Sequence, residues 1–301
     1  MKVLLATDGS NNAIESARFL KRMQLSEPMD LTLLSVSFDP AGASAEVIQP
    51  WFPEWLEQQQ ADFEKHHSQL ESMLSSQCSS VSKRLNDGHA ASVILEVAKE
   101  SEIDLIVMGA QGHSAIGRFV LGSVSDSVAT HADCSVLVVH PGTDGAANSS
   151  DCPTLALAYD SSSAAKEAVA ELTELGLPAE TPLTLISVAP VFDYSLGEGL
   201  AAIAVENEQA VSESMTRALE EACQSIRDSF PKVSGRIEKG RHIGDTIIEC
   251  VDKESCELLV IGDAGHSLIH DWILGSTTKF VLRNAPCSVW LSRHHRKPNA
   301  A

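Results

Sequence analysis

The feature that most constrains this chain is a glycine motif that occurs twice. The pattern G-x2-G-x9-G-[ST] spans Gly109–Ser123 and returns at Gly262–Ser276. An unrelated chain of similar length would contain one such motif by accident in roughly one sequence in a hundred. Asp8 and Asp160, which each follow a short apolar stretch, lie 152 residues apart, almost the spacing of the motifs. Two copies in register indicate a tandem repeat of one domain design.

The repeat divides the chain into two domains. A length of 301 residues suits two domains of the usual ~100–200 residues. The segment 142–152 concentrates Gly, Asn, Ser and Asp, a composition typical of linkers. We therefore expect domains over residues 1–141 and 153–293, the linker 142–152 between them, and a polar tail over 294–301.

Charge and composition exclude several classes of partner. The formal net charge of −19 argues against general binding to nucleic acid or to an anionic membrane, since the whole surface would repel both. No apolar run approaches the ~20 residues that a membrane helix needs, and the first apolar stretch is too short for a secretory signal. The seven cysteines are scattered and contain no C-x-x-C pair. Such cysteines argue against a disulfide framework or a zinc site, so we expect a cytoplasmic protein.

Apolar strands and helical segments alternate through each half. In the first half, the hydrophobic pattern predicts strands over residues 2–7, 31–36, 81–86, 104–108 and 135–139, and helices over 11–23, 54–77, 92–100 and 123–131. The segment 37–53 is rich in Pro, Gly and Ala and is expected to be a loop. The alternation predicts an α/β fold with a parallel sheet, whose ligands bind at the carboxyl ends of the strands where the winding reverses.

Each glycine motif follows a buried-looking strand and ends where a helix is expected to start. Strand, glycine loop and helix N-terminus form a phosphate-binding geometry, because glycine lets the backbone approach a ligand and the helix dipole faces an anion. Ser123 and Ser276 are expected to cap these helices. Asp8 and Asp160 are expected to face the loops across a crevice in each domain. The alternatives are tight turns that need glycine and aspartates that only cap helices.

Together these motifs resemble the universal stress protein family. The first half contains Asp8-Gly-Ser10 after its first strand, Val36 after its second, the glycine motif after its fourth and Ala132-Asp-Cys-Ser-Val at its end. The second half repeats this order with Asp160-Ser161, Val188, the second glycine motif and Ala285-Pro-Cys-Ser-Val289. The resemblance covers nearly the whole chain, as two fused domains.

The resemblance implies two tandem flavodoxin-like or adenine nucleotide α-hydrolase-like domains, each a five-stranded parallel sheet flanked by helices, that bind ATP. The positions that match the family's adenine contacts are Ala6, Thr7, Asp8 and Val36. Those that match its ribose and phosphate contacts are Met108, Gly109, Gly112, Gly122, Ser123, Val124 and Ser125, and Arg118 is expected to add a cation near the phosphates. The corresponding positions of the second half are Asp160, Val188, Gly262, Gly265, Gly275, Ser276 and Thr277.

The resemblance also implies a metal and a mode of assembly. Asp8 is a candidate ligand for a Mg²⁺ ion bound with the nucleotide. Members of the family usually pair through their last strands. We therefore expect the two halves to pair within the chain, as a pseudo-dimer, through residues 136–139 and 289–291. The whole chain is also a candidate for a homodimer.

The two halves differ at positions that bear on nucleotide binding. Arg118 in the first half is replaced by Asp271 in the second, whose glycine loop also contains Asp263. An anion near a triphosphate lowers the affinity of the site. Tyr159 replaces Thr7, and its ring is expected to fill part of the adenine pocket. We therefore expect the first half to bind nucleotide more tightly than the second.

Three functions are compatible with these motifs: an ATP-binding regulatory protein of the stress response, a slow ATPase or self-phosphorylating enzyme, and a partner-binding scaffold that has lost its ligand. The near match Gly112-x4-Gly117-Arg118 lacks the Lys-[Ser/Thr] of a P-loop, so no catalytic residue is assigned. His66 and His67 would point about 100° apart on a helix. We therefore expect both side chains to be solvated rather than to bind a metal.

Overall fold

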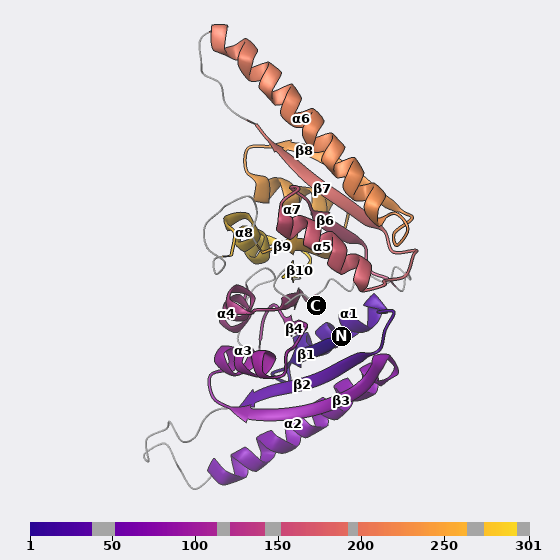
Figure 1. The fold of residues 1–301 in the computed structure, drawn as a ribbon. Helices are drawn as coiled ribbons and strands as arrows, with labels where there is room; N and C mark the ends of the chain where they lie inside the picture. The colour runs from indigo at the N-terminus through magenta and orange to yellow at the C-terminus, as the bar shows by residue number, and fades with distance from the viewer. Residues whose placement is uncertain (38–51, 113–120, 142–151, 192–197, 264–273, 294–301) are drawn as a thin grey trace. The chain divides into compact units, whose positions relative to one another are not determined.

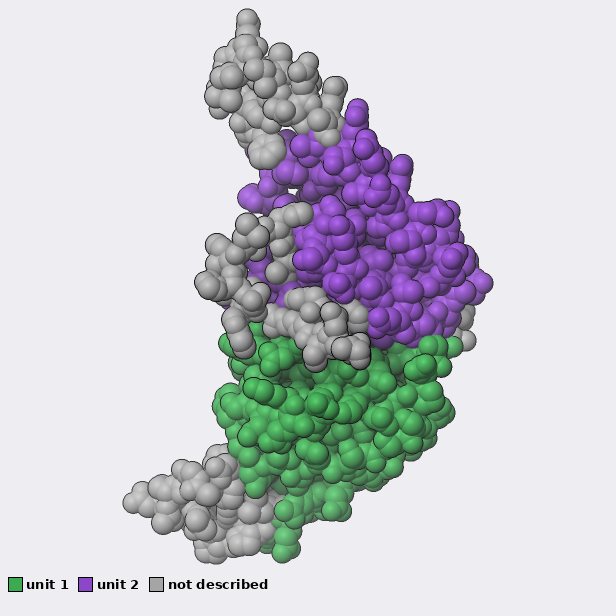
Figure 2. Space-filling view, in the orientation of Figure 1, with its two compact units in different colours: residues 1–147 green, residues 148–301 purple. Residues whose placement is uncertain are grey.

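The chain forms two compact units. The computed structural model describes residues 1–37, 52–112, 121–141, 152–191, 198–263 and 274–293. Unit 1 comprises residues 1–147 and unit 2 comprises residues 148–301, and the two are coloured separately in Figure 2. Each unit is an alternation of strands and helices, as Figure 1 shows.

Unit 1 contains five strands and four α-helices among its described residues. In chain order they are β1 (Lys2–Ala6), α1 (Asn11–Met23), β2 (Met29–Ser37), α2 (Phe52–Leu74), β3 (Cys78–Asp87), α3 (Ala90–Glu100), β4 (Leu105–Gly109), α4 (Ser123–His131) and β5 (Ser135–Val139). A single 3-10 turn, Ser75–Gln77, follows α2.

The sheet of unit 1 has the order β3-β2-β1-β4-β5, and all of its strand pairs are parallel. The chain winds outward from β1 to β3 and then resumes at β4 on the other side of β1. The winding therefore reverses at β1. In such sheets the crevice at the carboxyl ends of the strands on either side of the reversal is the usual ligand site. The same order distinguishes this sheet from the 2-1-3-4-5 order of flavodoxin.

Helices cover both faces of this sheet. Consecutive residues of β1, Val3 to Ala6, are all buried, although their side chains alternate between the two faces. Helix α1 packs on β4 and β5 and contacts α2, whereas α3 packs on β2 and contacts α4. Phe19 and Leu20 of α1 are fully buried. Near-continuous apolar runs thus become central strands, while β3 at the edge of the unit is mostly exposed.

Unit 2 repeats the design. Its elements are β6 (Leu155–Ala158), α5 (Ser163–Glu174), β7 (Leu183–Pro190), α6 (Glu198–Ile226), β8 (Val233–Gly240), α7 (Ile243–Lys253), β9 (Leu258–Gly262), α8 (Ser276–Asn284) and β10 (Ser288–Ser292). Its strands are again parallel, in the order β8-β7-β6-β9-β10. The predicted α/β class and the tandem five-stranded sheets are confirmed.

The loop expected over residues 37–53 is bounded differently in the structure. Ser37 is the last residue of β2, and Phe52 is the first residue of α2; residues 38–51 lie outside the described part of the chain. The prediction ended at Pro53 because proline is usually a helix breaker. Proline is tolerated in the first turn, however, where its missing N–H would have no helical partner.

All seven cysteines lie in the described residues and are free thiols. Within the described ranges, no helix combines the length and the apolarity needed to cross a membrane. The same residues contain no group of three or more His, Cys, Asp or Glu side chains placed to hold a metal ion.

Candidate functional site

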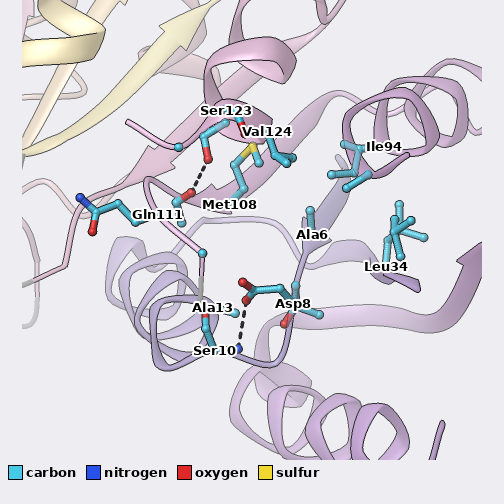
Figure 3. Close-up of a pocket in the computed structure, with 17 residues that line it drawn as sticks. Ala6, Asp8, Ser10, Ala13, Leu34, Ile94, Met108, Gln111, Ser123 and Val124 are labelled. Atoms are coloured by element: carbon cyan, nitrogen blue, oxygen red, sulfur yellow. Dashed lines mark hydrogen bonds between the residues drawn. The ribbon is translucent and has the colours of Figure 1, made fainter. Parts of the chain in front are cut away.

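A pocket of about 260 Å³ lies in unit 1 at the carboxyl ends of β1, β2 and β4 (Figure 3). The β1–α1 loop, the start of α3, the glycine loop after β4 and the N-terminus of α4 surround it. Its lining residues are Ala6, Thr7, Asp8, Ser10, Ala13, Leu34, Val36, Ala90, Ile94, Met108, Gly109, Gln111, Gly112, Gly122, Ser123, Val124 and Ser125.

The pocket has an apolar end and a polar end. Leu34 and Ile94 lie together on one side of it, whereas Asp8, Ser10 and Gln111 lie on the other (Figure 3). Asp8 is the one acidic side chain among the described lining residues, and none of them is lysine or arginine. A ligand that fills this pocket therefore needs an apolar part and a polar part.

The glycine loop is held by hydrogen bonds to three successive carbonyl oxygens. The Ser125 hydroxyl donates to the Gly109 oxygen at 2.8 Å, and the Gly122 N–H donates to the Ala110 oxygen at 2.8 Å. The side-chain amide of Asn12 donates to the Gln111 oxygen at 2.9 Å. Protein donors thus bind all three of these carbonyl groups, which fixes the loop conformation. Ser125, a position expected to contact a ligand, lines the pocket and also holds the loop through this hydroxyl.

Helix α4 begins at the edge of the pocket without a capping side chain. Gly122 is its N-cap and Ser123 is its first helical residue, so the prediction that Ser123 caps this helix is wrong. Helix α8 repeats this arrangement with Gly275 as the N-cap, and the corresponding prediction for Ser276 is also wrong. In each motif the last glycine is the N-cap, so the serine that ends the motif is the first residue of the helix. The first-turn N–H groups and the dipole of α4 consequently face the site.

The Asp8 carboxylate lies next to the glycine loop, at Gly112. Its Oδ1 accepts a hydrogen bond from the Ser10 N–H at 3.0 Å, the pattern of an Asx turn. Its Oδ2 lies 2.7 Å from the position that a Cβ at Gly112 would occupy. Any side chain at Gly112 would therefore displace this carboxylate. Ser10, rather than Asp8, is the N-cap residue of α1.

His66 and His67 are buried, so the prediction that they are solvated is wrong. Their side chains are 8% and 4% exposed. His66 Nε2 lies 2.8 Å from the Thr7 hydroxyl, just after β1, and His67 Nε2 lies 2.8 Å from the Ser35 hydroxyl on β2. The two rings point in different directions and are still both buried, because one reaches the residue just after β1 and the other reaches β2. Both histidines lie within one helical turn of Leu70 and share the buried face of α2 with Leu70 and Leu74. This helical spacing is the sequence signal for their burial.

Burial changes the acid–base behaviour of His67. Removal from water, and after it the positive charges of His66 and Lys83, lowers the pKa of His67 to about 4. His67 is therefore neutral at physiological pH and joins α2 to β2 as a hydrogen-bonding group rather than as a cation. Thr7 lines the pocket, and His66 of α2 contacts the Thr7 hydroxyl. Helix α2 therefore supports the pocket wall from behind.

Unit 2 reproduces the backbone of this site. The Asp160 Oδ1 accepts from the Ser162 N–H at 3.0 Å, as Asp8 does from Ser10. The Gly275 N–H donates to the Asp263 oxygen at 2.8 Å, and the Thr278 hydroxyl donates to the Gly262 oxygen at 2.9 Å. The glycine loops of the two units are therefore closed by equivalent hydrogen bonds.

The side chains around the second loop differ from those of the first. The carboxylate of Asp263 lies 3.5 Å from the guanidinium of Arg293, and both side chains are buried. The negative charge that Asp263 adds to the second loop is therefore paired with a cation. Tyr159 is buried, and burial, followed by the charges of Asp160 and of Glu221 on α6, raises its pKa.

The structure brings most of the predicted first-half residues together. The predicted positions that line the pocket are Ala6, Thr7, Asp8, Val36, Met108, Gly109, Gly112, Gly122, Ser123, Val124 and Ser125. Arg118, Gly265 and Asp271 lie outside the described residues. Val188 is buried at the end of β7, and Thr277 lies in the first turn of α8.

The prediction omitted several pocket residues: Ser10, Ala13, Leu34, Ala90, Ile94 and Gln111. Ser10 and Ala13 were recognisable from their position beside Asp8. Leu34 and Ile94 are core residues in sequence, and only the approach of α3 to β2 places them at the pocket.

Comparisons with known proteins agree with this architecture. The model of the universal stress protein family matches residues 1–140 and 153–293. A Staphylococcus haemolyticus protein named for that family is 31% identical over 140 residues, which cover 46% of this chain and 82% of that protein. A solved universal stress protein from Archaeoglobus fulgidus has a TM-score of 0.63 at 19% identity and covers 97% of this chain and 96% of its own. A Pseudomonas aeruginosa structure named for the family has a TM-score of 0.58 at 16% identity, covering 97% and 92%.

Proposed function

Because the chain belongs to the universal stress protein family, whose model matches both halves, we propose that the pocket of unit 1 binds ATP and thereby regulates the protein in a stress response. The observation that carries the proposal is the two-ended chemistry of this pocket at the point where the winding of the sheet reverses. An adenine nucleotide has the matching chemistry, with a flat apolar base at one end and phosphates at the other.

The base belongs at the apolar end of the pocket. Leu34 and Ile94 supply apolar surface there, and Val36 near the end of β2 lines the same pocket. Burial of apolar ring surface against these side chains supplies binding free energy of about 25 cal/mol per Å².

The phosphates belong at the polar end, where the glycine loop meets α4. Gly112, Gly122 and Ser123 line this end, and the uncapped first turn of α4 supplies N–H groups and the positive end of a helix dipole. These local donors matter because the net charge of −19 repels an anion at long range. Asp8, the acidic residue of the described lining, suits Mg²⁺ bound together with the phosphates.

Unit 2 is proposed to bind nucleotide more weakly. Asp263 is paired with Arg293 and no longer counts against binding. Two differences favour weaker binding: Asp271 stands in place of Arg118, and Ala164 stands at the position of Asn12, whose amide holds the glycine loop of unit 1.

Calorimetric titration of the nucleotide-free full chain with ATP and Mg²⁺ tests the proposal. Gly122→Val is the informative variant, because Gly122 lines the pocket and a Cβ there would lie 3.3 Å from the Ala110 oxygen. Gly275→Val is the matched control in unit 2. We expect the wild type and Gly275→Val to bind ATP and Gly122→Val to lose most of the heat.

Three other outcomes would change the assignment. Absence of binding to the wild type would refute ATP binding and leave a scaffold that recognises protein partners. Release of phosphate or labelling of the protein by ATP in the same samples, lost in Asp8→Ala, would make the protein an enzyme. Equal loss in both valine variants would refute the assignment of the site to unit 1.

A further inference from the structure

Asn12 connects the two loops that form the walls of the pocket. It lies in the first turn of α1, next to the β1–α1 loop that contains Asp8, and its amide donates to the Gln111 oxygen in the glycine loop at 2.9 Å. The two residues are 99 positions apart in the chain. The contact is close, because a Cβ at Gly109 would lie 3.1 Å from the Asn12 Cβ.

This hydrogen bond orients a peptide group at the polar end of the pocket. In a trans peptide the carbonyl and the following N–H point in opposite directions. Since the Gln111 carbonyl points to Asn12, the Gly112 N–H points away from Asn12. Gly112 lines the pocket and Asn12 does not, so this N–H turns toward the ligand side.

The orientation matters because the described lining residues offer an anion no cationic side chain. No lysine or arginine is present among the described lining residues, and Asp8 is itself negative. A carbonyl oxygen turned toward a phosphate would add repulsion, whereas an N–H donates a charge-assisted hydrogen bond. The carbonyls of Gly109 and Ala110 are already bound by Ser125 and Gly122.

Unit 2 lacks this side-chain donor. The residue 152 positions after Asn12 is Ala164 in α5, which has no amide. A Cβ at Gly262 would lie 2.8 Å from the Ala164 Cβ and 3.0 Å from its carbonyl carbon, so the helix approaches the second loop closely with its backbone. The other two loop hydrogen bonds are retained there, from Thr278 and Gly275. Asn12 thus distinguishes unit 1 from unit 2, although the first two loop carbonyls accept equivalent hydrogen bonds in both.

We propose that Asn12 is a positioning residue that makes the glycine loop of unit 1 selective for the phosphate part of its ligand. The inference rests on the proposed ATP site and deepens it. Asn12 acts through the Gln111–Gly112 peptide and does not touch the nucleotide itself. The apolar end of the pocket, which receives the base, is independent of this hydrogen bond.

The test compares ATP with adenosine, which lacks phosphates, by calorimetric titration of the nucleotide-free full chain. Asn12→Ala introduces the residue of unit 2, and Asn12→Asp keeps the size of the side chain but replaces its donor by an acceptor. We expect Asn12→Ala to weaken ATP binding about five- to tenfold, the loss of one hydrogen bond, and Asn12→Asp to weaken it further. Adenosine binding should change less than about twofold in both variants.

Asn11→Ala is the matched control, because Asn11 is an exposed neighbour in the same turn and does not line the pocket. It should leave both ligands unchanged. Equal losses for ATP and adenosine would show a merely structural role and overturn the inference, as would unchanged ATP binding in Asn12→Asp. If the wild type binds adenosine but gains nothing from phosphates, the inference fails while nucleoside binding stands. If it binds neither ligand, the proposed function fails as well.

Discussion

Replacing His67 by leucine should remove an acid-sensitive group from the core of unit 1. The His67 ring is 4% exposed and lies 2.8 Å from the Ser35 hydroxyl, and its pKa is lowered from 6.5 to about 4. In the unfolded chain the ring takes up a proton below pH 6.5, whereas in the folded protein it does so only below about pH 4. The unfolded state therefore binds more protons between these values, and the free energy of unfolding falls as the pH drops.

The size of this effect follows from the two pKa values. Linkage between 6.5 and about 4 predicts a loss of about 1.2 kcal/mol from pH 7 to pH 5.5, and at most about 3.4 kcal/mol at lower pH. The first interval is the useful one, because most carboxylates remain ionised there. The leucine variant should lack this part of the pH dependence.

Unit 2 shows that leucine suits this position. The residue 152 positions after His67 is Leu219, which is buried. The hydroxyl of Ser187, the counterpart of Ser35, donates to the backbone oxygen of Tyr159. In the variant the Ser35 hydroxyl can turn to the oxygen of Thr7 in the same way. The cost at pH 7 should therefore stay within about 1 kcal/mol.

Native-state hydrogen exchange of the full chain, read by mass spectrometry, resolves the two units. Peptides from β1 and β2 report on unit 1, and peptides from β6 and β7 are the internal control in the same sample. We expect the protection of unit 1 to fall between pH 7 and pH 5.5 about 1.2 kcal/mol more in the wild type than in His67→Leu. The same fall in both proteins would refute the argument that buried, neutral His67 is the sensor.

Three further predictions concern helix capping in the two units, the buried ion pair of unit 2 and the contact between Gly112 and Asp8. The Ser162 hydroxyl caps α5, so Ser162→Ala should lower the free energy of unfolding of unit 2 by about 1 kcal/mol. The buried Ser10 hydroxyl has no hydrogen-bond partner among the described residues, so Ser10→Ala should lower the free energy of unfolding of unit 1 by less than about 0.5 kcal/mol. Denaturant titrations that give Ser10→Ala and Ser162→Ala the same loss would contradict this difference. Arg293→Leu leaves the buried carboxylate of Asp263 without its ion pair and should cost about 3 kcal/mol, most of which Asp263→Ala should restore in the double variant; no recovery would contradict the pairing. Gly112→Ala displaces an exposed carboxylate, so it should weaken ATP binding in calorimetry while the melting temperature stays within about 2 °C, and normal binding would argue against that contact.

The sequence by itself determined the family, the tandem design and most of the pocket lining. These properties have local signals: apolar runs for buried strands, a 3.6-residue period for helices, and glycine where the backbone must pass close to another group. The equal spacing of the two motifs then showed that one design occurs twice. Asp8, Gly109 and Gly122 were found in this way before any contact was known.

Only the tertiary structure decided which polar side chains became partners. The pairs His67 with Ser35, Arg293 with Asp263, and Asn12 with Gln111 each join residues that are at least 30 positions apart. Residue type does not reveal such a pair, because a histidine or an arginine is as compatible with solvent as with a buried partner. Whether such a side chain is solvated or has a buried partner depends on which strands are neighbours and how closely a helix approaches them. The sequence contains asparagine in α1 and alanine at the corresponding position of α5, but only the structure shows that this asparagine holds the glycine loop of unit 1.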